Sequence, residues 1–238
     1  MNFNKTKKME KDFRKFYKGN NPFGMTAFDD IMKKGVMVPQ MITPYILEER
    51  TMNVTQMDIF SRLMSDRIIF FGETVTSEVC NIVVSQLLFM ENVNDEAPIT
   101  MYINSGGGSV YDGLSVIDTM NFINPEVSTT CTGMAASMGA MLLLSGEKGK
   151  RSALKHSRIM LHEPSTSIPR STASDIEIEW NEISKIKKEL FEMIAECTGQ
   201  KYEKVVEDCK RDFWMSSQAA KDYGIIDNII CKEAKKKK

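Results

Sequence analysis

The pattern of apolar and polar positions alternates between strand-like and helix-like spacing along this chain. Short uninterrupted apolar runs are typical of strands buried on both faces, and four occur, at residues 67–71, 99–104, 127–132 and 157–161. Apolar residues three and four apart predict amphipathic helices, here over 54–64, 77–90, 110–122 and 173–197, with shorter ones near Tyr202 and Ser217. This alternation predicts one α/β domain with mainly parallel strands and right-handed crossovers.

Two local signals refine the expected boundaries. Ser77 is a residue type that favours the N-cap position, so we expect it to begin the helix over 77–90. The small residues of 133–140 predict a turn that leaves the strand at 127–132 and opens another helix.

The composition is that of a protein with a substantial core and little net charge. Of its 238 residues 42% are hydrophobic, and the formal net charge is −1. Such a charge gives no bulk attraction to nucleic acid or to anionic membranes. No apolar run reaches the ~18 residues that a membrane span needs. We therefore expect a soluble, cytoplasmic protein that binds neither nucleic acid nor membranes.

The cysteines and histidines argue against a metal site or a disulfide framework. The five cysteines are odd in number and show no C-x-x-C spacing, and the chain has only two histidines. This usage indicates reduced thiols in a cytosolic setting and excludes a multi-histidine metal site. No metal and no cofactor are expected.

Both ends of the chain are basic. Residues 1–37 carry many lysines but no apolar segment of the kind found in secretory signals, so they are interpreted as a flexible or removable leader. The lysine-rich residues 232–238 are interpreted as a solvated tail. These assignments leave residues 38–231 as the folded domain.

Three glycines, Gly106 to Gly108, follow directly after the predicted strand at 99–104. Glycine lets a backbone approach a ligand closely and turn its amides toward it. The same residues could instead form a plain flexible turn. The spacing is not G-x-G-x-x-G, so a dinucleotide site is poorly supported.

Ser137 lies among small residues at the start of a predicted helix. Small neighbours leave room for a substrate carbonyl, and a helix N-terminus offers free amides and a positive dipole end. The alternative is a serine that merely caps the helix, which is common. The G-x-S-x-G nucleophile elbow is absent because position 135 is alanine.

His162 follows the strand predicted at 157–161, at the same sheet edge as Ser137, whereas His156 precedes that strand and is interpreted as a solvated loop residue. A serine nucleophile needs a base, the base needs an acid that fixes its tautomer, and the oxyanion needs preorganised amides. Acidic residues are plentiful, and the pattern alone does not choose among four of them: Asp175, Asp208, Asp212 and Asp222.

Several dispersed segments together resemble the proteolytic subunits of Clp proteases. They agree in order and spacing over roughly residues 38–230, and they are 102–108, 118–123, 133–140, 149–151, 158–162, 174–178, 211–213 and 219–225. The resemblance implies a ClpP/crotonase-like fold with a projecting helical handle. It also implies two stacked seven-membered rings, a tetradecamer, that enclose a proteolytic chamber.

The same resemblance assigns roles to individual residues. It implies a serine endopeptidase with Ser137 as nucleophile, His162 as base and Asp212 as acid, which leaves Asp175 structural. The oxyanion-hole amides that it implies are those of Gly108 and Met138.

The resemblance also implies partners. An AAA+ unfoldase of the ClpX, ClpA or ClpC type would use ATP to feed unfolded polypeptides into the chamber, so this subunit would need no cofactor. The residues implied for its docking cleft are Tyr102, Phe122, Leu154 and Ile230. Four nearby positions are more polar than the family pattern, which predicts a more polar cleft: Thr100, Thr130, Thr132 and Ser152.

Other departures concern the loops and the joint between rings. Gly106 stands where the family has a proline, and residues 165–172 lack the expected glycines. Lys210 replaces a frequent acid, which argues against a cross-ring ion pair with Arg211.

Three alternatives to a serine endopeptidase are a non-catalytic ring subunit, a crotonase-fold acyl-CoA enzyme and a Ser/Lys dyad peptidase. The first would lose triad residues, the second typically uses glutamates, and the third would not require His162.

Overall fold

A computed structural model of the chain describes residues 45–50, 53–167 and 170–231, all of which fall in one compact unit. The predicted leader, 1–37, and the predicted tail, 232–238, lie outside the described residues. Within the described part, no helix is long and apolar enough to cross a membrane.

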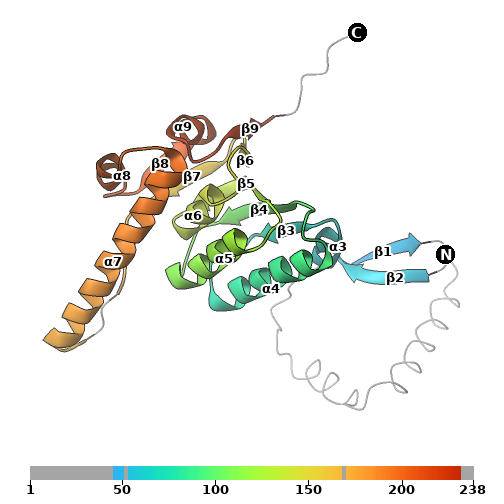
Figure 1. The fold of residues 1–238 in the computed structure, drawn as a ribbon, viewed down its shortest axis with the longest axis horizontal. Coiled ribbons are helices and arrows are strands. Elements are labelled where there is room, and N and C mark those ends of the chain that lie inside the picture. The colour runs from blue at the N-terminus through green and yellow to red at the C-terminus, as the bar shows by residue number, and fades with distance from the viewer. Residues whose placement is uncertain (1–44, 51–52, 168–169, 232–238) are drawn as a thin grey trace, which may run out of the picture. The chain divides into compact units, whose positions relative to one another are not determined.

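Seven strands of the described region form one mostly parallel sheet, in the order β3-β4-β5-β6-β9, with β7 pairing β5 and β8 pairing β7 (Figure 1). Only β8 runs antiparallel to its neighbour in this sheet. Its strands are β3 (Ile68–Phe71), β4 (Ile99–Ser105), β5 (Val127–Ala136), β6 (Arg151–Leu154), β7 (Arg158–Leu161), β8 (Phe213–Ser216) and β9 (Asn228–Ile230). A separate antiparallel pair is formed by β1 (Tyr45–Arg50) and β2 (Asn53–Asp58).

The long strand β5 changes partners along its length. Its first half pairs with β6, where Cys131 lies opposite Ala153, and its second half pairs with β7, where Ala136 lies opposite Met160. The second half therefore reaches beyond β6 and ends beside β7, where the chain turns into the next helix.

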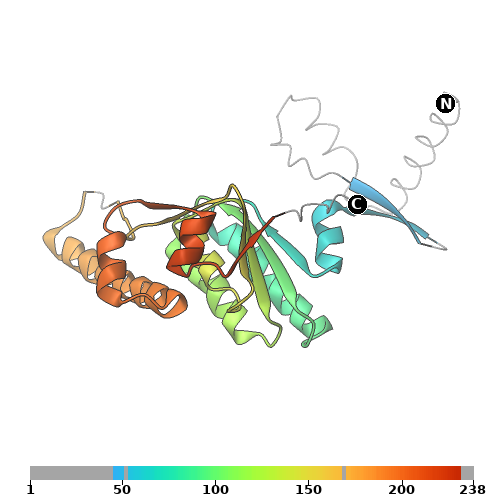
Figure 2. The ribbon, with the colours of Figure 1, turned by 90° about the horizontal axis from the view of Figure 1, so that it is seen from above.

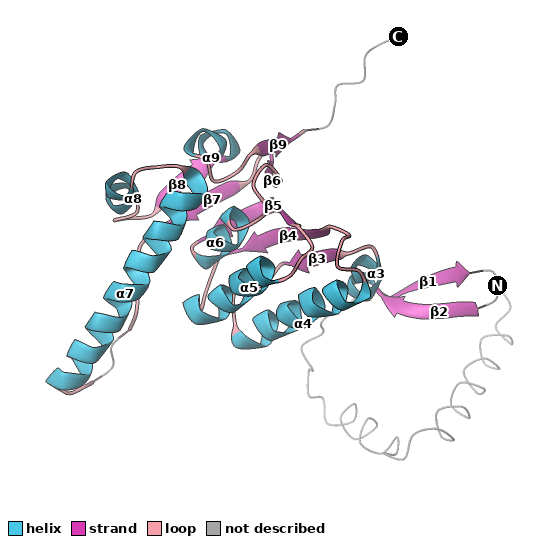
Figure 3. Ribbon diagram, in the orientation of Figure 1, coloured by secondary structure: helices cyan, strands magenta, loops and turns pink. Residues whose placement is uncertain are grey.

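Helices pack against the sheet and bury an apolar core between the layers. Figures 1 and 3 show α4, α5 and α6 together on one face of the strands, and Figure 2 shows the same arrangement after a 90° turn. The described helices are α3 (Ile59–Ser65), α4 (Ser77–Val93), α5 (Val110–Phe122), α6 (Met138–Leu144), α7 (Ala173–Thr198), α8 (Tyr202–Asp208) and α9 (Ser217–Tyr223). Every residue of α6 is buried, which fixes the helix that follows Ser137 in the centre of the fold.

Polar side chains define the helix starts. Thr76 caps α4, Ser109 caps α5, and Thr172 forms a capping box with Asp175 at the start of α7. These contacts satisfy backbone amides that have no partner inside the helix. Asp175 thus has a structural role, as expected, because its side chain forms part of the cap of α7.

Three sequence-based expectations were partly wrong. Residues 54–64 are not one helix, because the β2 strand runs to Asp58, whose carboxylate then caps α3. Ser77 is the first residue of α4, and Thr76 is its cap. Residues 133–136 form the end of β5 rather than a turn, because β7 supplies a pairing partner. The short strands β6, β8 and β9 were not predicted.

Candidate active site

Ser137 connects β5 to α6 in a strained backbone conformation. Its φ of 53° and ψ of −125° make it, with Arg67, one of two positive-φ residues other than glycine in the described region. Its amide donates to the Met160 carbonyl at 2.9 Å, yet its hydroxyl makes no capping bond to α6. The capping alternative is therefore wrong. Strained residues of this kind concentrate at functional sites.

Strand register explains why Ser137, His162 and Asp212 meet. The parallel β5–β7 pair ends with Ala136 opposite Met160. The antiparallel β7–β8 pair has Leu161 opposite Phe213. The residue after β7 and the residue before β8 therefore lie at one edge of the sheet, beside the residue that ends β5.

The three side chains are in contact at that edge. The Ser137 Oγ lies 2.8 Å from the His162 Nε2, a hydrogen-bond distance. The His162 Nδ1 lies 3.4 Å from the Asp212 Oδ1, within ion-pair range. The Asp212 side chain is 62% exposed and that of His162 27%, so the site opens to solvent from the acid's side.

The other candidate acids are engaged elsewhere. Asp175 belongs to the cap of α7, Asp208 accepts from the Tyr223 hydroxyl, and Asp222 accepts from Gln218. The geometry thus selects Asp212 from the four acids that the sequence left open. His156 is exposed, as predicted.

The glycine loop lies against Ser137. Gly107 has a φ of +92°, and a Cβ there would lie 2.7 Å from the Ser137 Cβ and 2.9 Å from the Met138 nitrogen. Gly108, with a φ of +152°, forms a parallel bridge with Val75 that uses the Gly107 carbonyl and the Ser109 amide. That bridge leaves the Gly108 amide unused, and Met138 is the first residue of α6, where amides have no intrahelical partner.

Comparison with known proteins identifies the family. The Clp protease profile matches residues 50–233. The chain is 49% identical over 222 residues to an ATP-dependent Clp protease proteolytic subunit of Bacteroides fragilis (strain YCH46), covering 93% of this chain and 99% of that one. It is 44% identical over 224 residues to the same subunit of Porphyromonas gingivalis, at 94% and 99% coverage. Proteolytic subunit 1 of Prochlorococcus marinus (strain MIT 9312) is 51% identical over 190 residues, at 80% and 97% coverage. The chain belongs to the Clp protease family.

In this Clp protease a small, largely apolar cavity of about 20 Å³ adjoins the serine. It is lined by Val110, Ser137, Met138, Met141, Leu161, His162, Pro164, Leu190 and Ile194. Leu190 and Ile194 were not singled out from the sequence. The sequence feature that could have pointed to them is their spacing: two apolar residues four apart lie on one face of a helix.

Only two of the four residues implied for unfoldase docking line a common groove. Leu154 lies opposite Ile230 in the β6–β9 pair, and both line a groove of about 1220 Å³. Tyr102 lies on β4, and Phe122, 76% exposed, ends α5; neither lines this groove. Thr132 lines it, so at least one of the polar departures faces this groove.

The remaining expectations concern charges and thiols. Lys210 pairs with Glu207 on α8 in this subunit. All five cysteines are free thiols. Within the described residues, no group of three or more potential metal ligands occurs.

Proposed function

We propose that this Clp protease subunit is a serine endopeptidase that uses Ser137, His162 and Asp212. The observation that carries the proposal is the 2.8 Å contact between the Ser137 Oγ and the His162 Nε2. It is made by a serine in a strained conformation whose hydroxyl takes no part in capping. A hydroxyl held against an imidazole in this way is a nucleophile beside its base.

In the proposed reaction, the Ser137 Oγ attacks the peptide carbonyl carbon while its proton passes to the His162 Nε2. The tetrahedral intermediate collapses, the C–N bond breaks, and the imidazolium returns the proton to the leaving amine. Water then attacks the acyl-enzyme and gives its proton to the same nitrogen. The ester bond to the Ser137 Oγ breaks, the imidazolium returns this proton to the serine oxygen, and the new carboxyl group is released. The Asp212 carboxylate orients the ring and stabilises the imidazolium.

The proposed oxyanion donors are the amides of Gly108 and Met138. The bridge to Val75 leaves the first free, and the second begins a helix. Amides fixed in advance stabilise a developing negative charge without reorganising during the reaction, and one such donor is worth about 10²–10³ in kcat in a serine protease.

We further propose that the subunit works in the cytoplasm within two stacked heptamers fed by an ATP-dependent AAA+ unfoldase. The named relatives are ATP-dependent protease subunits, whereas the chain itself offers no nucleotide motif. Unfolded polypeptides are the proposed substrates, because a closed chamber would exclude folded ones. The small cavity beside Ser137 favours a compact apolar side chain next to the scissile bond.

A fluorophosphonate probe tests the proposal directly. Wild-type protein should be labelled at Ser137, as located by peptide mass spectrometry, and should hydrolyse a fluorogenic peptide. The Ser137→Ala variant should lose both properties, and His162→Ala should lose labelling as well. Ser115→Ala, at an exposed serine of α5, is the matched control and should behave as wild type.

Retained hydrolysis by pure Ser137→Ala would exclude the serine mechanism, and retained activity of His162→Ala would favour a Ser/Lys dyad. An intact but inert wild type would indicate a non-catalytic ring subunit.

The intact mass of the same proteins tests whether the predicted leader is removed. Self-removal near residue 37 predicts a shortened wild type and a full-length Ser137→Ala variant.

A further inference from the structure

Helix α7 meets the rest of the subunit close to the active site. Its first half is exposed, as at Trp180 (66%), and extends away from the sheet in Figure 1. Its first buried residue is Leu190. Lys187 precedes Leu190 by one turn, so it lies where the exposed half of the helix becomes the packed half.

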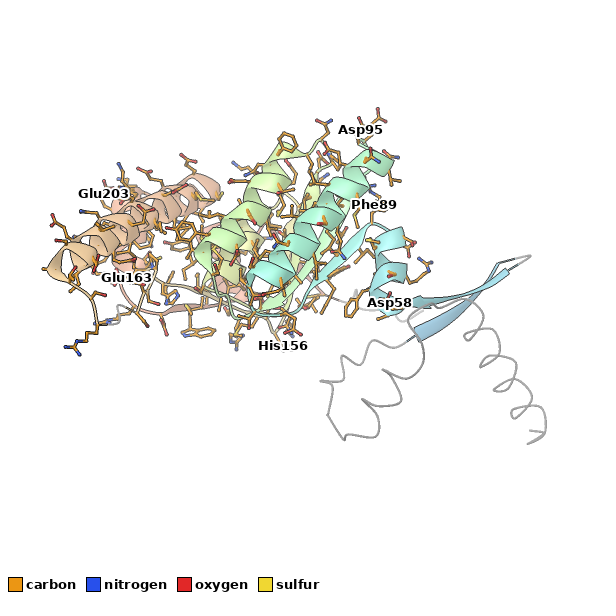
Figure 4. All side chains as sticks on the ribbon, turned by 90° about the horizontal axis from the view of Figure 1, so that it is seen from below. Asp58, Phe89, Asp95, His156, Glu163 and Glu203 are labelled. Atoms are coloured by element: carbon orange, nitrogen blue, oxygen red, sulfur yellow. The ribbon has the colours of Figure 1, made fainter. Side chains whose placement is uncertain are left out.

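Lys187 forms an ion pair with Glu163, the residue that follows His162. The Glu163 amide also donates to the Cys209 carbonyl at 2.9 Å, so both its backbone and its side chain are held. The hydrogen bond from Lys187 outweighs burial and lowers the pKa of Glu163, with further lowering by the charges of Lys187, Arg211 and His162. Figure 4 labels Glu163 beside the ribbon of α7.

The same lysine is tied to the packed half of α7. Its Nζ lies 5.7 Å from the centre of the Phe191 ring, which is buried in the core. Leu190, the residue before Phe191, lines the cavity that contains Ser137 and His162. The Glu163–Lys187 pair thus joins the end of β7 to the helix that forms one wall of the site.

We propose that the Glu163–Lys187 ion pair is a positioning device that keeps His162 in register with Ser137. This inference rests on the proposed function. The imidazole must stay within hydrogen-bond reach of the Ser137 Oγ, and Glu163 is covalently next to it. Asp212 restrains the ring weakly on the other side, at 3.4 Å and from an exposed side chain. A second restraint on the same segment of backbone compensates for that loose contact.

Charge reversal separates this role from a general structural one. Glu163→Lys and Lys187→Glu each place like charges together, and the double variant restores an opposite pair in reversed order. Lys188→Glu is the matched control, because Lys188 is the next residue on α7 and pairs only with Glu192 among the ion pairs of the described region. Peptide hydrolysis and the rate of fluorophosphonate labelling are measured on assembled protein isolated by gel filtration.

Each single reversal should lower kcat and the labelling rate about two- to fivefold, the range open to a half-exposed pair, with KM unchanged. The double variant should recover at least half of the loss, and Lys188→Glu should match wild type. Single variants equal to Lys188→Glu, or a double variant no better than the singles, would overturn the inference. Failure of the serine mechanism shows separately, as unlabelled Ser137 in the wild type.

Discussion

Replacing Gly107 by alanine is expected to abolish most of the activity while leaving the subunit folded. Gly107 has a φ of +92°, which costs a residue with a Cβ roughly 1–2 kcal/mol. The added carbon would also lie 2.7 Å from the Ala136 carbonyl oxygen and 2.7 Å from the Ser137 Cβ. An ordinary contact needs about 3.5 Å, so the loop and Ser137 must separate by about 0.8 Å.

That displacement acts on the distance on which the proposed mechanism depends. The Ser137 Oγ lies 2.8 Å from the His162 Nε2, and a shift approaching 1 Å takes it out of hydrogen-bond range. Misplacement of reacting groups by about 1 Å can cost roughly 10²-fold, so kcat/KM should fall by about that factor. The conformational cost remains well below the ~5–15 kcal/mol that holds a domain folded.

Gly106→Ala supplies the matched control. A Cβ at Gly106 meets only the Met134 Cε, at an ordinary 3.5 Å, and its φ is not positive. Peptide hydrolysis and fluorophosphonate labelling should therefore stay within about twofold of wild type. Thermal unfolding and sedimentation monitor folding and assembly of both variants. Wild-type kcat/KM in Gly107→Ala, or an equal loss in Gly106→Ala, would refute the reasoning.

Two further predictions concern stability and partner binding. Asp227 accepts hydrogen bonds from the buried Arg151 side chain and from two backbone amides. Asp227→Asn leaves the buried Arg151 charge without its partner, so it should lower the free energy of unfolding by about 3 kcal/mol. Urea titrations at neutral pH measure this loss. Burial raises the pKa of Asp227, but the contacts with Arg151 outweigh burial, so the pKa is lowered in the folded protein. The difference in free energy of unfolding between the variant and the wild type should therefore be full above pH ~4. It should vanish as the pH falls through the pKa that Asp227 has in the folded protein. Lys155 and Lys221 line the groove that contains Leu154. Replacing both lysines by glutamate should weaken unfoldase-dependent degradation, while hydrolysis of a short peptide stays unchanged. An equal loss of both activities would contradict a docking role for the groove.

The sequence was informative wherever a signal is local. Apolar runs located β3, β4 and β7, and helical spacing located α5 at its observed bounds. Ser137 and His162 could be proposed because each follows a strand whose apolar run is visible in the chain. The strained backbone of Ser137 could not be predicted, because it results from β5 continuing to pair with β7 up to the residue before it.

Signals that arise only from tertiary contact were missed. The strand β8 has four residues and no alternating pattern, so nothing local indicated that it pairs with β7. The close approach of Gly107 to Ser137 depends on the Val75 bridge, which joins segments more than 30 residues apart. The sequence pointed to three glycines, but only the fold distinguishes Gly107 and Gly108, where a Cβ would collide with backbone atoms, from Gly106, where it would not.

The direction of β8 brings Asp212, the proposed acid, to the sheet edge that carries Ser137 and His162. β5 and β7 are parallel, so each contributes the residue that follows its last position, Ser137 and His162. β8 is antiparallel to β7, so at the same edge it contributes the residue that precedes its first position, which is Asp212. An acid beyond the other end of β8, such as Asp222 on α9, lies at the opposite edge, where Ser216 is paired with Arg158. The chain order Ser, His, Asp therefore follows from three neighbouring strands, of which the last is reversed.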